Sequence, residues 1–258
     1  MNPRPPCPSP TAVPTDGSGG SRRGFTLVEL LVVVAVVSVL AGLLLPALAR
    51  SRAVAGSGRC LSNQRQLGLS AQLYWDDHGG RAFPERRSRT NGGWNYWFGW
   101  LADGAEGQRA FDPTQGALWP YLQGRAVTAC PALARSGTPI KAKAVGAAFG
   151  YGYNLLVGTR TESGIRLSTV SDPSGLALFT DCAQVNDFQA PASPEHPMLE
   201  EFYYFDLLSP TVHFRHRGAS ATAFVDGHAA AVPPKPGSQD LRLPGEVLGT
   251  LRDEQVRP

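Results

Sequence analysis

Hydrophobic and polar positions follow three different patterns along this chain. Residues 25–49 are almost uniformly apolar, and Glu29 is the only charged residue among them. About 20 helical residues, at 1.5 Å each, cross the hydrocarbon core of a bilayer. The segment therefore predicts a transmembrane helix. Pro46 lies near its far end, where a proline kinks a helix that continues beyond it.

Residues 50–79 are polar but keep an apolar stripe. Its members recur at spacings of seven, four and three residues, as on one helix face: Cys60, Leu67, Ala71 and Tyr74. We expect an amphipathic continuation of the same helix to about Asp77, ended by Gly79 and Gly80. Each interior glycine weakens a helix by about 1 kcal/mol relative to alanine. A local break near residues 56–58 is therefore also compatible with the pattern.

Residues 80–232 consist of short apolar runs between turn residues, which predicts a β-rich globular head. The expected strands are at residues 147–156, 176–181, 202–205, 212–216, 221–225 and 228–232. Asp226-Gly227 separates the last two, and an Asp-Gly step between apolar runs is a strong hairpin signal. Residues 233–258 are rich in proline and charge and predict a loose tail. Together the patterns predict an α+β fold, with a long N-terminal helix packed on an antiparallel β-sheet head.

Residues 1–24 differ from the rest in composition. The first 20 are rich in Pro, Gly and Ser, which is typical of a disordered leader, and Arg22 and Arg23 follow. The net charge of the whole chain is +3, too weak and too scattered to indicate nucleic-acid binding. We find no Ser-His-Asp arrangement, no Gly-rich phosphate loop and no paired carboxylates in a motif. The sequence thus favours a protein that is not an enzyme, and we expect no cofactor.

Glu29 needs an explanation, because a carboxylate in hydrocarbon is costly. A plain membrane anchor could carry it close to the membrane surface, where its side chain would reach water. A secretory signal peptide is the second interpretation, because Ala47-Leu48-Ala49 resembles the small-residue cleavage site of such peptides. However, the apolar region of such a peptide has about 7–15 residues, and an acid inside it is out of place.

A third interpretation starts from the residues around Glu29. The stretch Gly24-Phe25-Thr26-Leu27-Val28-Glu29 resembles the leader-cleavage motif of type IV pilins and type II secretion pseudopilins. The resemblance implies that a prepilin peptidase cuts after Gly24 and N-methylates Phe25. It further implies that Glu29 pairs with the terminal amine of a neighbouring subunit during assembly. Pro46 falls where pilin helices commonly kink.

The same resemblance implies a location and a set of partners. The leader would lie in the cytoplasm, a single span would cross the inner membrane, and the head would lie in the periplasm or on the cell surface. The partners would be the peptidase and other pilin or pseudopilin subunits, in a pseudopilus or pilus-like fibre of a type II secretion-type system. The alternative is a membrane-anchored binding protein, with a carbohydrate or protein ligand, that does not polymerise.

The C-terminal half adds a second resemblance. His216, nine intervening residues and then Asp226-Gly227 are similar to the C-terminal motif of large prepilin-like proteins from planctomycete and verrucomicrobial genomes. Residues 60–68, 74–84 and 150–154 also resemble these proteins.

Three histidines near this motif suggest metal binding, because imidazole and carboxylate ligands suit zinc. The four candidate ligands are His213, His216, Asp226 and His228. Yet Asp226 is better explained as a turn residue, and alternate positions of one strand face opposite sides. We therefore expect no metal site. Calcium on Asp226 and backbone carbonyls remains an alternative, because some pseudopilins hold calcium in a C-terminal loop.

Two further features leave alternatives open. Trp94, Trp97 and Trp100 recur every third residue, which suits one face of a short helical turn. We expect these rings to pack over the long helix, and a sugar-binding or partner-binding face is the alternative. Cys60 could form a disulfide with Cys130 or Cys182 in an oxidising periplasm, or the cysteines could be buried and free.

Overall fold

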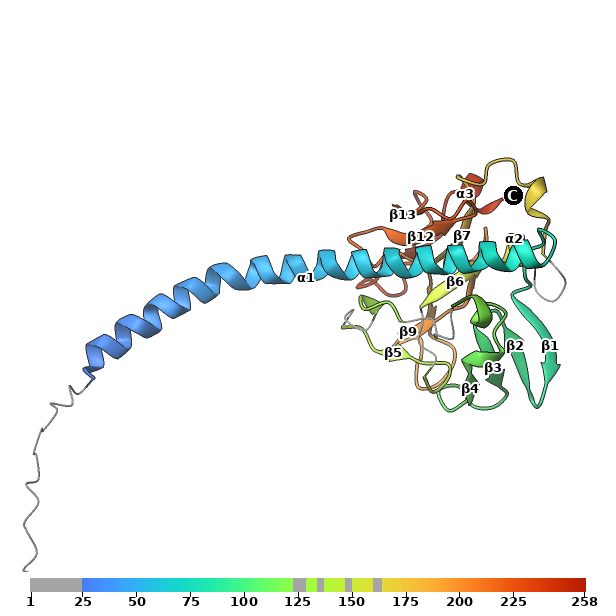
Figure 1. Ribbon diagram of the computed structural model, residues 1–258. Helices are drawn as coiled ribbons and strands as arrows, with labels where there is room; N and C mark the ends of the chain where they lie inside the picture. Colours follow the sequence, from blue (N-terminus) through green and yellow to red (C-terminus); the bar gives the residue numbers. More distant parts are fainter. Residues whose placement is uncertain (1–24, 123–128, 134–136, 147–149, 160–163) are drawn as a thin grey trace, which may run out of the picture. The chain divides into compact units, whose positions relative to one another are not determined.

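The structure is a computed structural model that describes residues 25–122, 129–133, 137–146, 150–159 and 164–258 (Figure 1). The leader expected at residues 1–24, with Gly24, lies outside the described residues. The chain divides into two compact units, Met1–Leu48 and Ala49–Pro258.

Helix α1 extends from Leu27 to Asp77, which confirms the long N-terminal helix. It continues without a break through residues 56–58. Gly79 and Gly80, with φ of 61° and 71°, end it in the left-handed conformation that favours glycine. His78 helps to close this end, because its Nδ1 lies 2.7 Å from the carbonyl oxygen of Tyr74.

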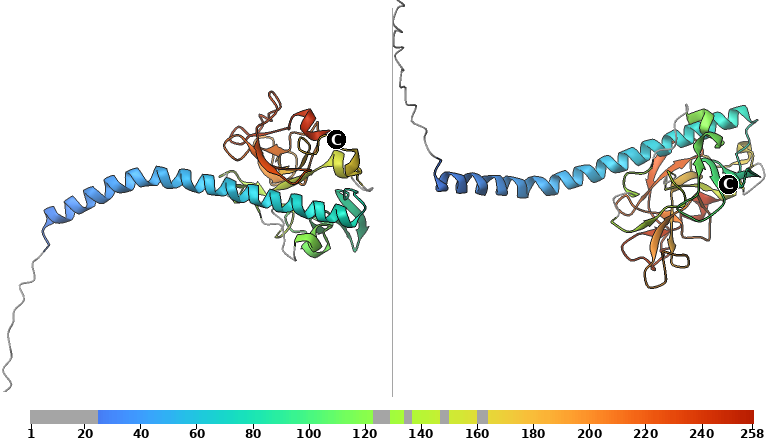
Figure 2. Two further views of the ribbon diagram at one scale, coloured as in Figure 1. Left: turned by 45° about the horizontal axis from the view of Figure 1, so that its top comes forward. Right: turned by 90° about the horizontal axis from the view of Figure 1, so that it is seen from below.

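Figure 2 shows the second half of α1 lying along the head, and the stripe predicted on this part of the helix is buried. Cys60, Leu67, Ala71 and Tyr74 are between 0 and 6% exposed, which confirms the amphipathic pattern. Gln64 lies on the same face and is fully buried. The apolar spacing did not predict that Gln64 is buried, because its side chain is polar.

A five-stranded sheet forms the centre of the described head, and it contains most of the predicted strands. Its order is β10 (Tyr204–Phe205), β6 (Tyr151–Asn154), β7 (Ala177–Asp181), β12 (Ser220–Phe224) and β13 (Ala229–Val232). All of its pairings are antiparallel except β10 with β6, which is parallel. The hairpin predicted at Asp226-Gly227 joins β12 to β13, and Gly227 has a φ of 90°.

The described head also contains smaller sheets and short helices. A four-stranded sheet comprises β1 (Arg86–Thr90), β2 (Gly93–Tyr96), β3 (Gly99–Ala102) and β4 (Phe111–Asp112). The other two comprise β5 (Ile140–Lys141), β9 (Met198–Glu201) and β8 (Ala183–Asn186), and β11 (Val212–His213) with β14 (Leu248–Gly249). The short helices are α2 (Leu155–Gly158), α3 (Asp253–Val256) and the 3-10 turns Pro113–Gln115, Trp119–Leu122 and Leu167–Thr169.

The helical turn expected for the tryptophan repeat is wrong. Trp94 and Trp100 lie on the paired strands β2 and β3, and Trp97 lies in the turn between them. The cause is Asn91-Gly92, whose φ values of 51° and 72° form a tight turn that starts this meander. Trp97 is 1% exposed, and its ring contacts that of Phe98, its neighbour in the turn, and that of Phe179 on β7. The expected packing of the three rings over the long helix stays a prediction.

The loose tail expected at residues 233–258 is also wrong. Strand β14 pairs with β11, and Leu251 and Val256 are 1% and 0% exposed. The fully buried Asn154 side chain donates hydrogen bonds to the carbonyl oxygens of Ala177 and Val256, at 2.8 and 2.9 Å. Prolines and charges alternate here with isolated apolar residues, and those residues fill a second core cluster together with Phe205, Phe214 and Phe224.

Candidate functional site

The N-terminal segment carries a capping box at the start of α1. Thr26 donates two hydrogen bonds to Oε2 of Glu29, one from its backbone N–H and one from its side-chain hydroxyl, at 2.8 Å each. In return, the N–H of Glu29 donates to the Thr26 hydroxyl at 3.2 Å. This reciprocal pattern satisfies N–H groups that a helix start leaves unpaired. Glu29 therefore has hydrogen-bond partners within its own chain, a role that our sequence analysis missed although Thr-x-x-Glu is its usual pattern.

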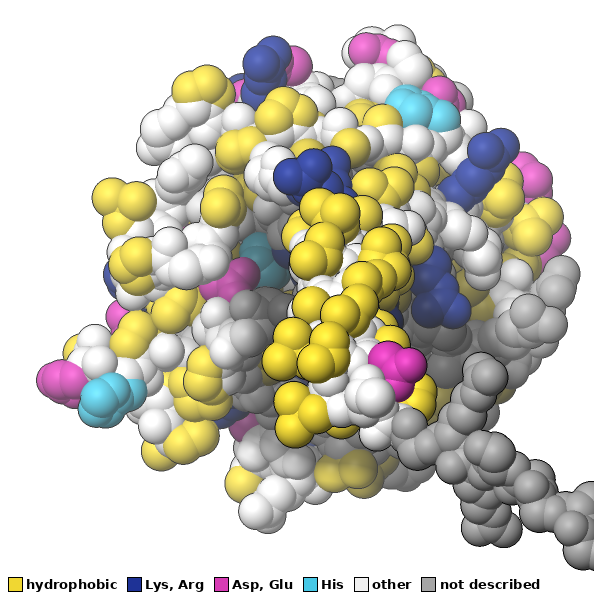
Figure 3. All heavy atoms as spheres, turned by 90° about the vertical axis from the view of Figure 1, so that its left-hand side faces the viewer, with side chains coloured by type: hydrophobic (Ala, Val, Ile, Leu, Met, Phe, Trp, Pro, Cys, Tyr) yellow, Lys and Arg dark blue, Asp and Glu magenta, His cyan; other side chains and the backbone are white. Residues whose placement is uncertain are grey.

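Beyond this cap, the first half of α1 presents apolar side chains to its surroundings on every side. Every residue from 25 to 48 is exposed, and Leu27, for example, is 78% exposed. Figure 3 shows hydrophobic side chains gathered over this part of the helix. Ser38, a polar residue within it, donates back to the carbonyl oxygen of Val34 at 2.7 Å. Length and composition make α1 a candidate membrane anchor.

Pro46 lies inside α1. A proline has no N–H, and its ring crowds the carbonyl four residues earlier, here that of Gly42. The kink that we expect at Pro46 stays a prediction.

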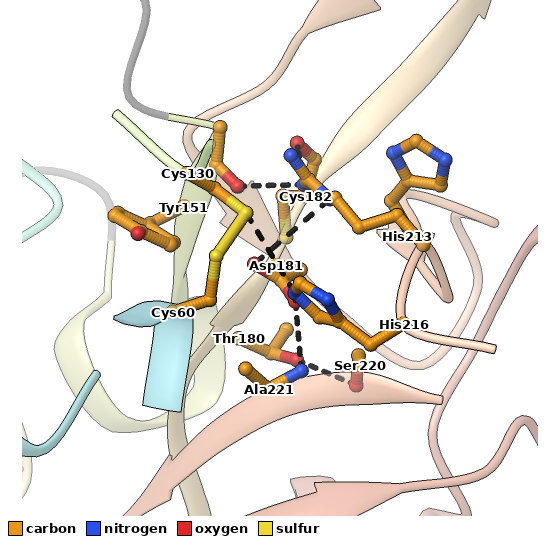
Figure 4. Close-up of polar contacts among 12 residues, drawn as sticks. Cys60, Cys130, Tyr151, Thr180, Asp181, Cys182, His213, His216, Ser220 and Ala221 are labelled. Atoms are coloured by element: carbon orange, nitrogen blue, oxygen red, sulfur yellow. Dashed lines mark hydrogen bonds and ion pairs between the residues drawn. A yellow bond between two sulfur atoms is a disulfide. The ribbon is translucent and has the colours of Figure 1, made fainter. Parts of the chain in front are cut away.

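In the head, the C-terminal motif builds a buried cluster around His216 (Figure 4). His216 lies in the turn between β11 and β12, and its side chain is 5% exposed. Its Nε2 is 3.1 Å from Oδ2 of Asp181, at the end of β7. Its Nδ1 is 3.2 Å from the hydroxyl of Ser57 on α1. The imidazole thus joins the central sheet to the second half of α1.

Arg215 lies beside this cluster and balances its charge. The Arg215 side chain is 2% exposed, and its Nη2 donates to the carbonyl oxygens of Gly150 and Cys182, at 2.8 and 3.0 Å. These two bonds hold Nε 3.9 Å from Oδ1 of Asp181. Oδ2 of Asp181 also accepts the N–H of Ala221 at 2.7 Å. A buried carboxylate needs a positive partner of this kind.

Cys60 and Cys130 form a disulfide next to His216, with their Cα atoms 5.4 Å apart. Sγ of Cys130 is 3.6 Å from Nε2 of His216. Cys182 is free and buried, and burial raises the pKa of its thiol well above the usual value. The disulfide links α1 to a segment 70 residues further along the chain.

The other end of the motif contacts α1 as well. A Cβ added to Gly68 would lie 3.5 Å from Cβ of Ala223 and 3.8 Å from Cα of Gly227. Gln72 donates to the carbonyl oxygen of Val225 at 3.3 Å. The helix therefore meets the motif at two places. Ser57 contacts His216 in the β11–β12 turn, and Gly68 lies near Gly227 in the β12–β13 hairpin.

The four residues considered for a metal site are not brought together in the described part of the chain. His213 bonds to Glu246 at 2.8 Å, His216 to Asp181, and the exposed His228 to Asp226 at 2.6 Å. Moreover β11 ends at His213, so His213 and His216 do not share a strand. Sequence reasoning missed Asp181, Arg215 and Ser57, which carry no motif of their own.

Comparison with known proteins is consistent with the N-terminal features. The family model described as the prokaryotic N-terminal methylation motif matches residues 20–45. This match supports a type IV pilin-like protein with a pilin-type precursor sequence. No curated protein and no solved structure gave a significant match.

Proposed function

We propose that this chain is a prepilin-like structural subunit. It is cleaved after Gly24, N-methylated at Phe25 and assembled into a pseudopilus or pilus-like fibre of a type II secretion-type system. Residues 25–49 hold it in the inner membrane before assembly, with the head in the periplasm or on the cell surface. Its partners are the prepilin peptidase and other subunits of the fibre.

One observation carries this proposal. The apolar residues 25–48 are all exposed, and most of them lie within the match to the methylation motif. In water such a surface would be strongly unfavourable, at roughly 25 cal/mol per Å² of apolar area. A bilayer can cover it first, and the same helices of neighbouring subunits can cover it afterwards. One segment can thus serve as both the anchor and the core of a fibre.

Glu29 would change partners between these two states. In the single chain its carboxylate accepts from Thr26. Cleavage before Phe25 creates an ammonium group at the positive end of the helix dipole, where a cation is unfavourable. The Glu29 carboxylate of an adjoining copy relieves this repulsion. Because a buried charge without a partner costs several kcal/mol, the pair would fix the register of docking.

The first experiment measures the mass and N-terminal sequence of the protein purified from membranes. We expect a start at methylated Phe25. A chain that keeps residues 1–24 would contradict the proposal, and a start at Arg50 or Ser51 would indicate an ordinary exported protein.

The second experiment separates the charge of Glu29 from its cap. Glu29→Gln keeps a side chain that can close the capping box but removes the charge. Thr26→Ala keeps the charge and removes the cap, at about 0.5–2 kcal/mol of helix stability. We expect Glu29→Gln to insert into the membrane but to lose at least tenfold in fibre incorporation, and Thr26→Ala to assemble within about twofold of the native level.

Mass spectrometry of each variant shows whether its leader was removed, so that a defect in cleavage is not mistaken for one in assembly. Equal losses in both variants would mean that the helix cap is what matters. Unchanged incorporation of Glu29→Gln would favour the membrane-anchored binding protein instead.

A further inference from the structure

We propose that the reduced form of this protein binds one Zn²⁺ ion, with Cys60, Cys130, His216 and Asp181 as its four ligands. In the structure the two sulfurs form a disulfide. The zinc site and the disulfide are alternative states of the same pair of cysteines. This proposal does not depend on fibre assembly, because all four residues belong to the unit Ala49–Pro258.

The four side chains already lie at ligand spacing. One donor atom from each lies within 4.8 Å of every other, and all four are buried. Nε2 of His216 is 3.6 Å from Sγ of Cys130 and 3.1 Å from Oδ2 of Asp181. Tetrahedral zinc with ordinary bond lengths places sulfur and nitrogen ligands about 3.6 Å apart, and nitrogen and oxygen about 3.4 Å apart. The two thiolates would have to separate to about 3.8 Å, again from tetrahedral geometry.

Neighbouring groups support these ligands as they do in zinc sites. The other ring nitrogen of His216, Nδ1, is 3.2 Å from the hydroxyl of Ser57. A metal-bound histidine usually has such a partner, which fixes the orientation of its ring. Oδ1 of Asp181 is buried and has no hydrogen-bond partner, although it lies 3.9 Å from Arg215. An unsatisfied carboxylate oxygen of this kind is a ready donor for a cation.

The charge of the buried cluster also suits a divalent ion. Two thiolates and the Asp181 carboxylate carry three negative charges, and Zn²⁺ with Arg215 carries three positive ones. Arg215 is 2% exposed and its Nη2 is fixed by two carbonyl oxygens, so its charge cannot move away. In the disulfide state the remaining pair, Asp181 and Arg215, is neutral as well. The site therefore avoids a net buried charge in either state.

An entry path leads to the site. A pocket of about 330 Å³ is lined by Ser57 and His216, together with Ala53, Ala132 and Gly218. Of the four ligands, His216 borders this pocket, so we expect an ion to approach the cluster from the side of the imidazole.

The test uses the full chain in detergent micelles. A trialkylphosphine reduces the disulfide under inert gas. The phosphine is oxidised to the phosphine oxide with an oxygen atom from water, and the two hydrogens of that water convert both sulfurs to thiols. After the phosphine is removed, Zn²⁺ is titrated against a chromophoric chelator, and Co²⁺ is added to a second sample. We expect one metal ion per reduced chain. We also expect the intense visible bands of tetrahedral Co²⁺, with thiolate charge-transfer absorption. The disulfide form should bind at least tenfold more weakly.

Matched variants locate the site. His216→Ala should lower zinc affinity at least tenfold, whereas His228→Ala, which removes an exposed histidine next to Asp226, should not. Cys130→Ser should lower the charge-transfer absorption about twofold, because Cys60 is then the one remaining thiolate of the site, whereas Cys182→Ser and Cys7→Ser should keep it. If a variant of the cluster fails to fold, the Co²⁺ spectrum of the native chain decides alone. A weak octahedral spectrum, or equal zinc binding by the reduced and disulfide forms, would overturn the proposal.

Discussion

At the scale of single residues, Glu29 illustrates how one side chain can satisfy two demands. The sequence suggested two partners for this acid in an apolar helix, a neighbouring subunit or the water at the membrane surface. The structure gives it a partner three residues away, in Thr26. These two bonds lower the cost of placing the carboxylate in a membrane, and on the proposed function Glu29 would exchange Thr26 for the terminal amine of a neighbouring subunit.

His213 leads to a prediction about pH. Burial lowers its pKa below the ordinary value of 6.5, and the positive charge of Arg215 lowers it further, against the opposing effect of Glu246. As the pH falls through 6.5, His213 therefore binds a proton in the unfolded chain but not yet in the folded chain. We expect the free energy of unfolding to be highest above this pH and to fall as the pH drops below it. The slope from this residue is at most about 1.4 kcal/mol per pH unit.

Thermal unfolding between pH 8 and pH 5, followed by near-ultraviolet circular dichroism, measures this slope. His213→Gln is the control, because its amide can still donate to Glu246 but does not titrate. The variant should show a shallower dependence on pH below 6.5 than the native protein. Equal slopes would assign the dependence to other groups.

The sequence predicted residues with a local pattern better than those with a distant partner. Asp226-Gly227 acts through the turn it forms, so its hairpin could be predicted. Asp181 and Arg215 act through contacts with segments 30 or more residues away, and nothing near them in the sequence indicates these contacts. For Cys60 the sequence left two partners open, and only the folded chain brings Cys130 next to it.

At the scale of elements, the contact between α1 and the β12–β13 hairpin depends on small residues. A Cβ added to Gly68 would meet Ala223 and Gly227 at ordinary van der Waals distance. The sequence suggested that this glycine weakens the helix, and the structure adds that it lets helix and hairpin approach closely.

We predict opposite effects for two substitutions at Gly68. Gly68→Ala should fit and raise stability by up to about 1 kcal/mol through helix propensity. Gly68→Leu should push the hairpin away and cost about 1–3 kcal/mol. Gly58→Leu is the control, because a Cβ at Gly58 meets nothing within 4 Å. Urea unfolding of the three variants checks the prediction, and a stable Gly68→Leu protein would contradict it.

Element type followed from the sequence where a pattern was long or strongly marked. The 51-residue helix and the strands of the central sheet were found in this way. The β1–β3 meander was not predicted, because the three-residue spacing of the tryptophans suits a helical turn, whereas in the structure a tight turn at Asn91-Gly92 starts a meander of strands. The two-residue strands β4, β5 and β14 are too short for any periodicity, and tertiary pairing alone defines them.

At the scale of the whole molecule, the C-terminal segment completes the head. Leu248, Leu251 and Val256 are buried, and fully burying such side chains contributes about 1.5–3 kcal/mol each. Their sum is comparable to the total stability of a domain, about 5–15 kcal/mol. We therefore predict that removal of residues 248–258 leaves the head unfolded.

Limited proteolysis and near-ultraviolet circular dichroism of the truncated chain provide the measurement. Removal of only the exposed Arg257 and Pro258 is the control and should leave both signals unchanged. A protease-resistant head in the longer truncation would contradict the prediction.

The bond from Asn154 to Val256 also imposes an order on biosynthesis. A ribosome that has just added Asn154 must add 102 more residues before this bond can form, which takes roughly 5 to 20 s at ordinary elongation rates. Until then Val256 is missing from the second core cluster. The apolar segment 25–48, in contrast, is ready to meet a membrane more than 200 residues before Val256 is made. The nascent chain is thus tethered long before its head can close.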